Sequence, residues 1–256
     1  MKKTKRAKKP ALHNNTSESQ ESARAQLRRL FSERPFDDEL LLTNFGLFMR
    51  SSAFAKLLFL HEAYLKIRSL PGDIFVFGVW LGQDVVAFES LRAILEPYNA
   101  SRKIIGFDTF DGYAGITKTD KPSNVISSSG YNTDAGYQGY LEELLAYHRR
   151  ENTMGHAVTH RLVRGDARIT VRQYADEHPE SMVALAYFDL ALHEPTAEAL
   201  NSIEDRLMPG SLIIMDELND ARYPGETIAF REWIRDKKYR ISRSEILPDR
   251  TFIVMQ

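Results

Sequence analysis

The chain has 256 residues, 43% hydrophobic and 27% charged, which is the composition of an ordinary globular protein with one large domain or two small ones. Its net charge of −1 creates no overall field that favours a nucleic acid or an anionic membrane, so we expect neither as a partner. The absence of cysteine excludes disulfides, thiolate metal sites and a cysteine nucleophile. Apolar runs such as "LLFL" fall far short of a membrane span, and a cytoplasmic location is expected.

The first 22 residues have the composition of a disordered basic tail. The stretch "MKKTKRAKK" has six basic residues in nine, and no acidic residue precedes Glu18. The segment lacks the apolar core of a secretory signal. A solvated leader is the favoured interpretation, and a segment that binds nucleic acid or membrane is the alternative.

Residues 23–70 are predicted to form an N-terminal helical cap. Apolar residues recur at helical spacing in three segments, "SARAQLRRLFSE", "FDDELLLTNFGLF" and "SSAFAKLLFLHEAYLKIRSL". In the third segment, Ser51 or Ser52 is the expected N-cap. The breaker sequence "PGD" then separates this cap from the rest of the chain.

From residue 71 to 256, short apolar runs alternate with helical segments five times. This β-α alternation predicts an α/β domain with a parallel sheet that is covered by helices on both faces. The last two predicted strands, "YRISRSEIL" and "RTFIVMQ", have no helix between them and are joined by "PD". We therefore expect the sheet to end in an antiparallel hairpin.

Acidic residues follow four successive predicted strands: Asp108, Asp166, Asp189 and the pair Asp216-Glu217. In an open parallel sheet the strands' carboxyl ends form the ligand-binding edge, so these side chains should lie close together. Asp108 is suited to accept both hydroxyl hydrogens of a ribose, whereas Asp166 is also explained as a helix cap. Asp189, Asp216 and Glu217 offer oxygen ligands for Mg²⁺ or Ca²⁺, although a solvated turn also explains Asp216-Glu217.

The first predicted strand leads into the turn "FGVWLGQD", which contains Gly78 and Gly82. Glycines allow a close approach of the backbone to a ligand, and a tight strand-to-helix turn is the alternative explanation. The chain has neither G-x-G-x-x-G nor a phosphate loop. The expected ligand therefore has a ribose and lacks a pyrophosphate.

Four stretches carry a resemblance to a known family: "IFVFGVWLG", "KIIGFDTFDGY", "YFDLALHEPT" and "GSLIIMDELNDARYPGETIAF". They resemble the class I S-adenosylmethionine-dependent methyltransferases of the macrocin and sugar O-methyltransferase type, over roughly residues 45–256. The resemblance implies a Rossmann-like fold with a seven-stranded sheet, bound S-adenosylmethionine, and a Mg²⁺ ion that orients a substrate hydroxyl.

The resemblance also implies which residues hold these groups. Asp108 would bind the ribose, Asp166 would lie near the adenine, and the segment Phe48-Met49 would cover the cofactor. Asp189, Asp216 and Glu217 fall on the metal positions. The full set of implied cofactor contacts is Met49, Phe77, Gly78, Gly82, Asp108, Thr109, Phe110, Gly165 and Asp166.

The chain differs from the family at positions that bear on catalysis. Sugar-modifying relatives have D-x-D-L-Y after the fourth strand, and Ala191 and His193 stand here at the second aspartate and the tyrosine. His193 is the nearest titratable replacement and the candidate general base, and a histidine that caps or packs on the next helix is the alternative. Val76 and Asp84 also depart from the family's pattern around the first glycine turn.

The long polar segment 111–137 is predicted to be a substrate lid, because loops of this length in compact domains are usually functional or disordered. The expected function is Mg²⁺-assisted O-methylation of a small hydroxylated acceptor, a sugar or a glycosylated natural product. A nicotinamide-dependent oxidoreductase and a non-catalytic scaffold that binds the cofactor are the alternatives. The sequence leaves the oligomeric state open, a homo-oligomer included.

Overall fold

The computed structural model describes residues 16–121, 123, 126–127 and 130–256. Most of the predicted tail lies outside these residues, but its last part is helical, because helix α1 (Glu18–Ser32) begins at Glu18. The tail was therefore predicted to extend too far. The physical reason is a capping box in which Ser17 accepts from the amide of Gln20, and Gln20 accepts from the amide of Ser17.

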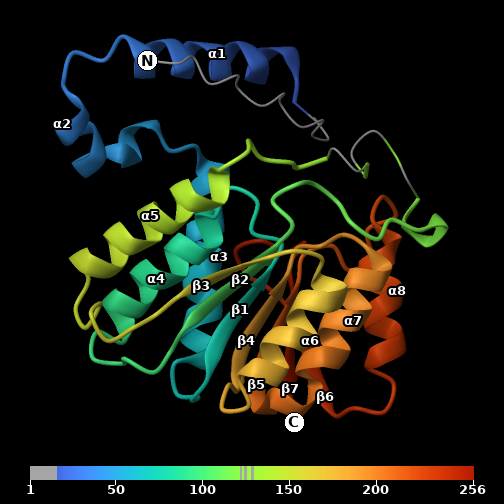
Figure 1. The fold of residues 1–256 in the computed structure, drawn as a ribbon. Helices are drawn as coiled ribbons and strands as arrows, with labels where there is room; N and C mark the ends of the chain where they lie inside the picture. The colour runs from blue at the N-terminus through green and yellow to red at the C-terminus, as the bar shows by residue number, and fades with distance from the viewer. Residues whose placement is uncertain (1–15, 122, 124–125, 128–129) are drawn as a thin grey trace.

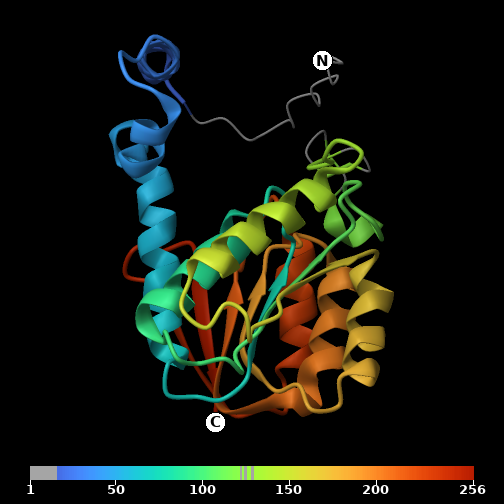
Figure 2. The same cartoon turned by 60° about the vertical axis from the view of Figure 1, so that its left-hand side comes forward.

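The N-terminal region continues through α2 (Asp38–Thr43), the short helix η1 (Phe45–Phe48) and α3 (Ser51–Ile67). Arg50, not either predicted serine, is the N-cap of α3, because the backbone of Ser51 is already helical. Helix α3 packs on the sheet, whereas α1 has no buried residue and projects with α2 away from the body (Figure 2). The predicted cap is thus a projecting arm followed by one packed helix.

The seven-stranded sheet has the strand order β3-β2-β1-β4-β5-β7-β6. Strand β7 alone runs opposite to the other six strands, which confirms the predicted terminal hairpin with β6 and the Rossmann-like α/β fold. The strands are β1 (Asp73–Phe77), β2 (Ile104–Asp108), β3 (Arg161–Arg164), β4 (Val183–Phe188), β5 (Leu207–Met215), β6 (Tyr239–Arg243) and β7 (Thr251–Met255).

Helices cover both faces of the sheet (Figure 1). Helix α3 lies on one face with α4 (Gln83–Leu95) and α5 (Tyr137–Glu151), and the other face carries α6 (Ala167–Glu177), α7 (His193–Ile203) and α8 (Pro224–Trp233). The short helices η2 (Lys118–Asp120) and η3 (Glu204–Arg206) lie in connections. Side chains of β1 alternate between the two apolar layers, which explains why its sequence is continuously hydrophobic. No helix in the described part of the chain is both long and apolar enough to cross a membrane.

The sheet topology places a binding edge between β1 and β4. These strands are adjacent, and the chain leaves β1 toward α4 on one face and β4 toward α7 on the other. Ligands in open α/β sheets bind where successive connections diverge in this way. The described parts of the segment 111–137, drawn in green, lie above this edge in Figure 1.

Candidate functional site

Gly78 and the carboxylate of Asp108 fix the conformation of the turn after β1. Gly78 has φ +89°, and a Cβ at this position would lie 2.0 Å from the carbonyl oxygen of Asp189 at the end of β4. Asp108, at the tip of β2, accepts from the amides of Val79 and Trp80, each at 2.7 Å, and from the amide of Phe110 at 2.6 Å. The Asp108 carboxylate therefore fixes the shape of this turn and also borders the space above it.

A cavity of about 110 Å³ lies at the ends of β1, β2, β3 and β4. The structure brings five predicted cofactor residues together in its lining: Gly78, Asp108, Thr109, Gly165 and Asp166. Apolar walls come from Ala167, Leu190, Leu192 and Pro195. Tyr113 and Tyr131 of the predicted lid also line the cavity, and their rings contact each other at 5.8 Å. Described residues from both ends of the predicted lid thus border this space.

Asp166 also serves as the N-cap of α6, as expected. Its side chain accepts from the amide of Arg168 at 3.0 Å and forms an ion pair with the guanidinium of Arg168 at 2.6 Å. These contacts hold the carboxylate at the rim of the cavity.

Two of the predicted cofactor residues have structural roles instead. The side chain of Phe77 is fully buried in the core, stacked between Phe107 and Phe188. Gly82 begins α4 with φ +82°, and a Cβ there would lie 2.4 Å from Leu141 of α5. Gly82 is therefore explained by the packing of two helices, and neither residue lines the cavity.

Phe110 and Met49 are likewise not brought to the cavity. The side chain of Phe110 is buried in the apolar layer under α4 and α5. Met49 follows η1, whose Phe48 packs on Phe31 and Phe36 in the projecting arm. Met49 itself lies between η1 and α3 and does not line the cavity, so its contact with a cofactor stays a prediction.

The three predicted metal ligands do converge. One carboxylate oxygen from each of Asp189, Asp216 and Glu217 lies within 4.8 Å of the other two. They meet because β4 and β5 are neighbours in register, with Phe188 opposite Met215, so the residues that follow each strand emerge side by side. The sequence prediction that these acids share one place is confirmed.

Burial, and after it the mutual repulsion of the carboxylates, disfavours the charged forms of this cluster. Burial, together with the charge of Asp189, raises the pKa of Asp216 to about 7. Burial and the neighbouring carboxylate of Glu226 raise the pKa of Glu217 to about 10. Glu226 belongs to α8, is fully buried, and accepts from the amide of Glu217 at 3.0 Å. A cation placed here would offset the repulsion.

The donor set fits a hard divalent ion such as Mg²⁺. Among the described residues, Oε2 of Glu217 is buried and has no hydrogen-bond partner. One oxygen of Asp216 accepts from the hydroxyl of Tyr187 at 2.6 Å and contacts Arg250, which leaves its second oxygen for another ligand. The cluster therefore offers oxygens that lack a protein partner.

Two cations that sequence reasoning missed balance part of this charge. Lys56 of α3 lies 3.0 Å from Asp84, and Arg250 pairs with Asp216. Burial lowers the pKa of Lys56, but the carboxylates of Asp84, Asp189 and Asp216 outweigh it and raise the pKa overall. Asp84 is thus paired with Lys56, although burial outweighs this pairing and raises the pKa of Asp84. No local pattern could reveal these pairs, because they join distant parts of the chain.

A larger cavity of about 1190 Å³ begins at the acidic cluster. It shares Trp80, Tyr131, Asp189 and Glu217 with the smaller cavity and continues to Arg231 on α8 and Arg243 on β6. The two cavities therefore meet at Asp189 and Glu217, while Asp216 lines the larger cavity alone. This arrangement suits two different ligands whose reacting atoms meet beside the acids.

His193 is not brought to either cavity. Its Nε2 lies 2.9 Å from a carboxylate oxygen of Glu232 on α8, and its amide donates to Asp120 at 2.6 Å. Both contacts hold the start of α7 against its neighbours. His193 therefore packs at the start of α7, which is the alternative that the sequence left open. The structure does not support its assignment as the general base.

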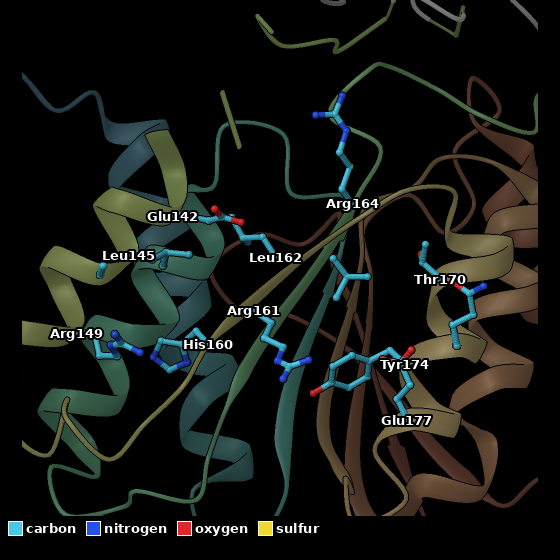
Figure 3. Close-up of a pocket in the computed structure, with 13 residues that line it drawn as sticks. Glu142, Leu145, Arg149, His160, Arg161, Leu162, Arg164, Thr170, Tyr174 and Glu177 are labelled. Carbon is cyan, nitrogen blue, oxygen red and sulfur yellow. The ribbon is translucent and has the colours of Figure 1, made fainter. Parts of the chain in front are cut away.

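A separate cavity of about 510 Å³ lies along the exposed edge of β3, between α5 and α6 (Figure 3). Arg161 and Tyr174 point toward each other across it, and His160 lies on its opposite side beside Arg149. His160 is paired with the buried Glu89 at 2.7 Å. None of the predicted site residues lines this cavity, so it is distinct from the binding edge.

Comparison with known proteins identifies the family. No protein-family model and no curated protein matches the chain. Among solved structures, CalS11, described as a calicheamicin methyltransferase, is 34% identical over 95% of this chain and 94% of its own, with a TM-score of 0.88. An apo structure of CalS11, described as a TDP-rhamnose 3'-O-methyltransferase of calicheamicin biosynthesis, is 33% identical over 95% and 96%, with a TM-score of 0.82.

The O-methyltransferase NovP shares the fold, with 15% identity over 79% of this chain and 80% of that chain and a TM-score of 0.60. The match to CalS11 extends over nearly the whole of both chains. The chain therefore belongs to the class I methyltransferases of the sugar O-methyltransferase type.

Proposed function

We propose that the protein transfers a methyl group from S-adenosylmethionine to a hydroxyl of a sugar, with the help of Mg²⁺. The observation that carries this proposal is the meeting of two cavities at Asp189 and Glu217. The smaller cavity is bordered by five of the nine residues that the family resemblance implies for the cofactor, and the larger one has room for an acceptor. A nucleotide-linked sugar is a suitable acceptor, since CalS11 is described as acting on TDP-rhamnose.

In the smaller cavity, Asp108 would hold the ribose, and Asp166 would lie near the adenine between Ala167 and Leu192. The glycine turn at Gly78 would lie against the methionine moiety, because no side chain occupies that position. Tyr113 and Tyr131 narrow the cavity to about 110 Å³, so we expect the segment that contains them to move when the cofactor enters.

Asp189, Asp216 and Glu217 would hold Mg²⁺ at the junction of the cavities. When bound, S-adenosylmethionine supplies the methyl group and Mg²⁺ polarises the acceptor hydroxyl. The chain's own residues bind and align the two ligands and exclude water through Trp80 and Tyr131, whose rings meet at 5.4 Å over the junction. Because His193 lies elsewhere, the hydroxyl proton would pass to Asp189, which borders both cavities.

The test combines binding and turnover. Calorimetry with S-adenosylhomocysteine and with NAD should show binding of the former alone. Methyl transfer from labelled S-adenosylmethionine should then be measured on a panel of nucleotide sugars and glycosides, with and without Mg²⁺. Binding of NAD without S-adenosylhomocysteine would indicate an oxidoreductase. Binding of S-adenosylhomocysteine with no transfer to any acceptor would indicate the non-catalytic scaffold.

A further inference from the structure

The far end of the larger cavity is built from neighbouring strand ends. Met215, the residue before Asp216, lies opposite Thr251 of β7, and Thr251 lies opposite Arg243 of β6. Strands β5 and β6 run in the same direction, so Arg243 lies at the same edge of the sheet as the acidic cluster. Two strand spacings, roughly 10 Å, separate the backbone of Arg243 from the end of β5.

The side chain of Arg243 lies on the face of β6 that is turned toward α8. Phe230 of α8 contacts the ring of Tyr239 at 6.4 Å, and Arg243 is on the same face as Tyr239, because side chains alternate along a strand. On α8, Thr227 and Arg231 are one turn apart, and both line the cavity with Arg243. Two guanidinium groups therefore border the same end of the cavity.

These two arginines differ from the other arginines that line the cavity. Arg222 is paired with Asp220 at 2.5 Å, and Arg250 is paired with Asp216. The side chains of Arg231 and Arg243 are exposed, and neither guanidinium group makes an ion pair or hydrogen bond with the residues that the structure describes. A planar guanidinium group donates two parallel hydrogen bonds, a geometry that matches a phosphate.

We propose that Arg231 and Arg243 form a subsite for the diphosphate of a nucleotide-linked sugar. This proposal rests on the proposed function and deepens it. The sugar would lie over the acidic cluster, its hydroxyl beside Asp189 and Glu217, and its anomeric diphosphate would extend along the cavity to the two arginines. The subsite thus selects sugars that are still attached to a nucleoside diphosphate, because a glycoside without phosphate gains nothing from either cation.

The test uses thymidine diphosphate as the probe and thymidine as its uncharged counterpart, both titrated into the full-length protein saturated with S-adenosylhomocysteine. Thymidine diphosphate should bind at least about ten-fold more tightly than thymidine. Arg231→Ala and Arg243→Ala should each weaken its binding about ten-fold or more, the effect of losing a charge-assisted hydrogen bond. Arg240→Ala is the matched control, because Arg240 is exposed on the opposite face of the same strand and does not line the cavity.

With TDP-rhamnose as the acceptor, the two substitutions should raise KM and leave kcat within a few-fold, because the arginines lie away from the reacting atoms. Equal affinity of the wild-type protein for thymidine and thymidine diphosphate would overturn the subsite, as would unchanged binding in both variants. Methylation of a sugar that lacks phosphate, unaffected by either substitution, would overturn the subsite while the proposed function stands. Failure of the wild-type protein to bind S-adenosylhomocysteine would instead count against the proposed function.

Discussion

The contacts of Asp108 lead to a prediction that separates its role in the fold from a role in binding. Its two carboxylate oxygens accept three backbone amides, two from the turn after β1 and one from Phe110. Asp108→Asn keeps the shape of the side chain but replaces one acceptor oxygen with a donor. If the remaining oxygen still accepts from the amides of Val79 and Trp80, the new NH₂ group faces the amide of Phe110. Both of these groups are donors, so they repel each other and form no hydrogen bond.

One hydrogen bond to a charged group is lost, worth about 1.5–3 kcal/mol, so we expect the free energy of unfolding to fall by about 3 kcal/mol once the repulsion between donors is included. For a chain of this length the melting temperature should drop by about 6–12 °C. The affinity for S-adenosylhomocysteine should fall by about 2 kcal/mol or more if the carboxylate also holds the ribose.

The assays are thermal and denaturant unfolding followed by circular dichroism, and calorimetry with S-adenosylhomocysteine at a temperature where both proteins are folded. Asp111→Asn is the matched control, since this neighbouring acid is exposed and does not line either cavity of the binding edge. If Asp108→Asn unfolds at the same temperature as the wild type and Asp111→Asn, the inference that this carboxylate shapes the turn is refuted.

Three further predictions concern the metal, the pH dependence of stability and the lid. EDTA should abolish methyl transfer and Mg²⁺ should restore it, and full activity in EDTA would exclude the metal assignment. Asp216→Asn should depress kcat severely and leave the Kd for S-adenosylhomocysteine within a few-fold. Burial alone would raise the pKa of Glu89, but hydrogen bonds from Arg92 and His160 outweigh it and lower the pKa to about 2. The stability that Glu89 contributes through these contacts should therefore be fully present above pH ~4.5 and be lost as the pH falls toward 2, by up to about 3 kcal/mol. In Glu89→Gln the free energy of unfolding should depend less steeply on pH over this range. Equal slopes in the two proteins would contradict this prediction. Limited proteolysis should cut within 111–137 in the free protein and less when cofactor and acceptor are bound, and equal cutting in both states would argue against a lid.

The order of strands and helices could be read from the sequence because it depends on local signals. Continuous apolar runs of four to nine residues, separated by helical patterns, specify buried parallel strands with crossover helices. The missed start of α1 also had a local signal, the capping box at Ser17 and Gln20. The clustering of Asp189 with Asp216 and Glu217 followed from one general rule, that parallel strands end at a common edge.

What the sequence could not decide was which residues near that edge point into the cavity. Phe77 adjoins Gly78 yet is buried in the core. Successive side chains of a strand point to opposite faces of the sheet, so the position in the strand, and not the sequence motif, decides where the side chain of Phe77 points. Gly82 and His193 have the spacing of site residues, but the packing of α5 and α8 against them gives each a structural role.

The charges that complete the site are the clearest contribution of the tertiary structure. Lys56 pairs with Asp84, and Arg250 pairs with Asp216. Glu226 of α8 lies against Glu217. No sequence pattern relates the two members of any of these contacts. The sequence by itself determined the fold class and the acids at the strand ends, because both follow from local pattern and a single topological rule. Only the folded chain decided which distant side chains balance those acids, because electrostatic and packing partners depend on distance in space and not on separation along the chain.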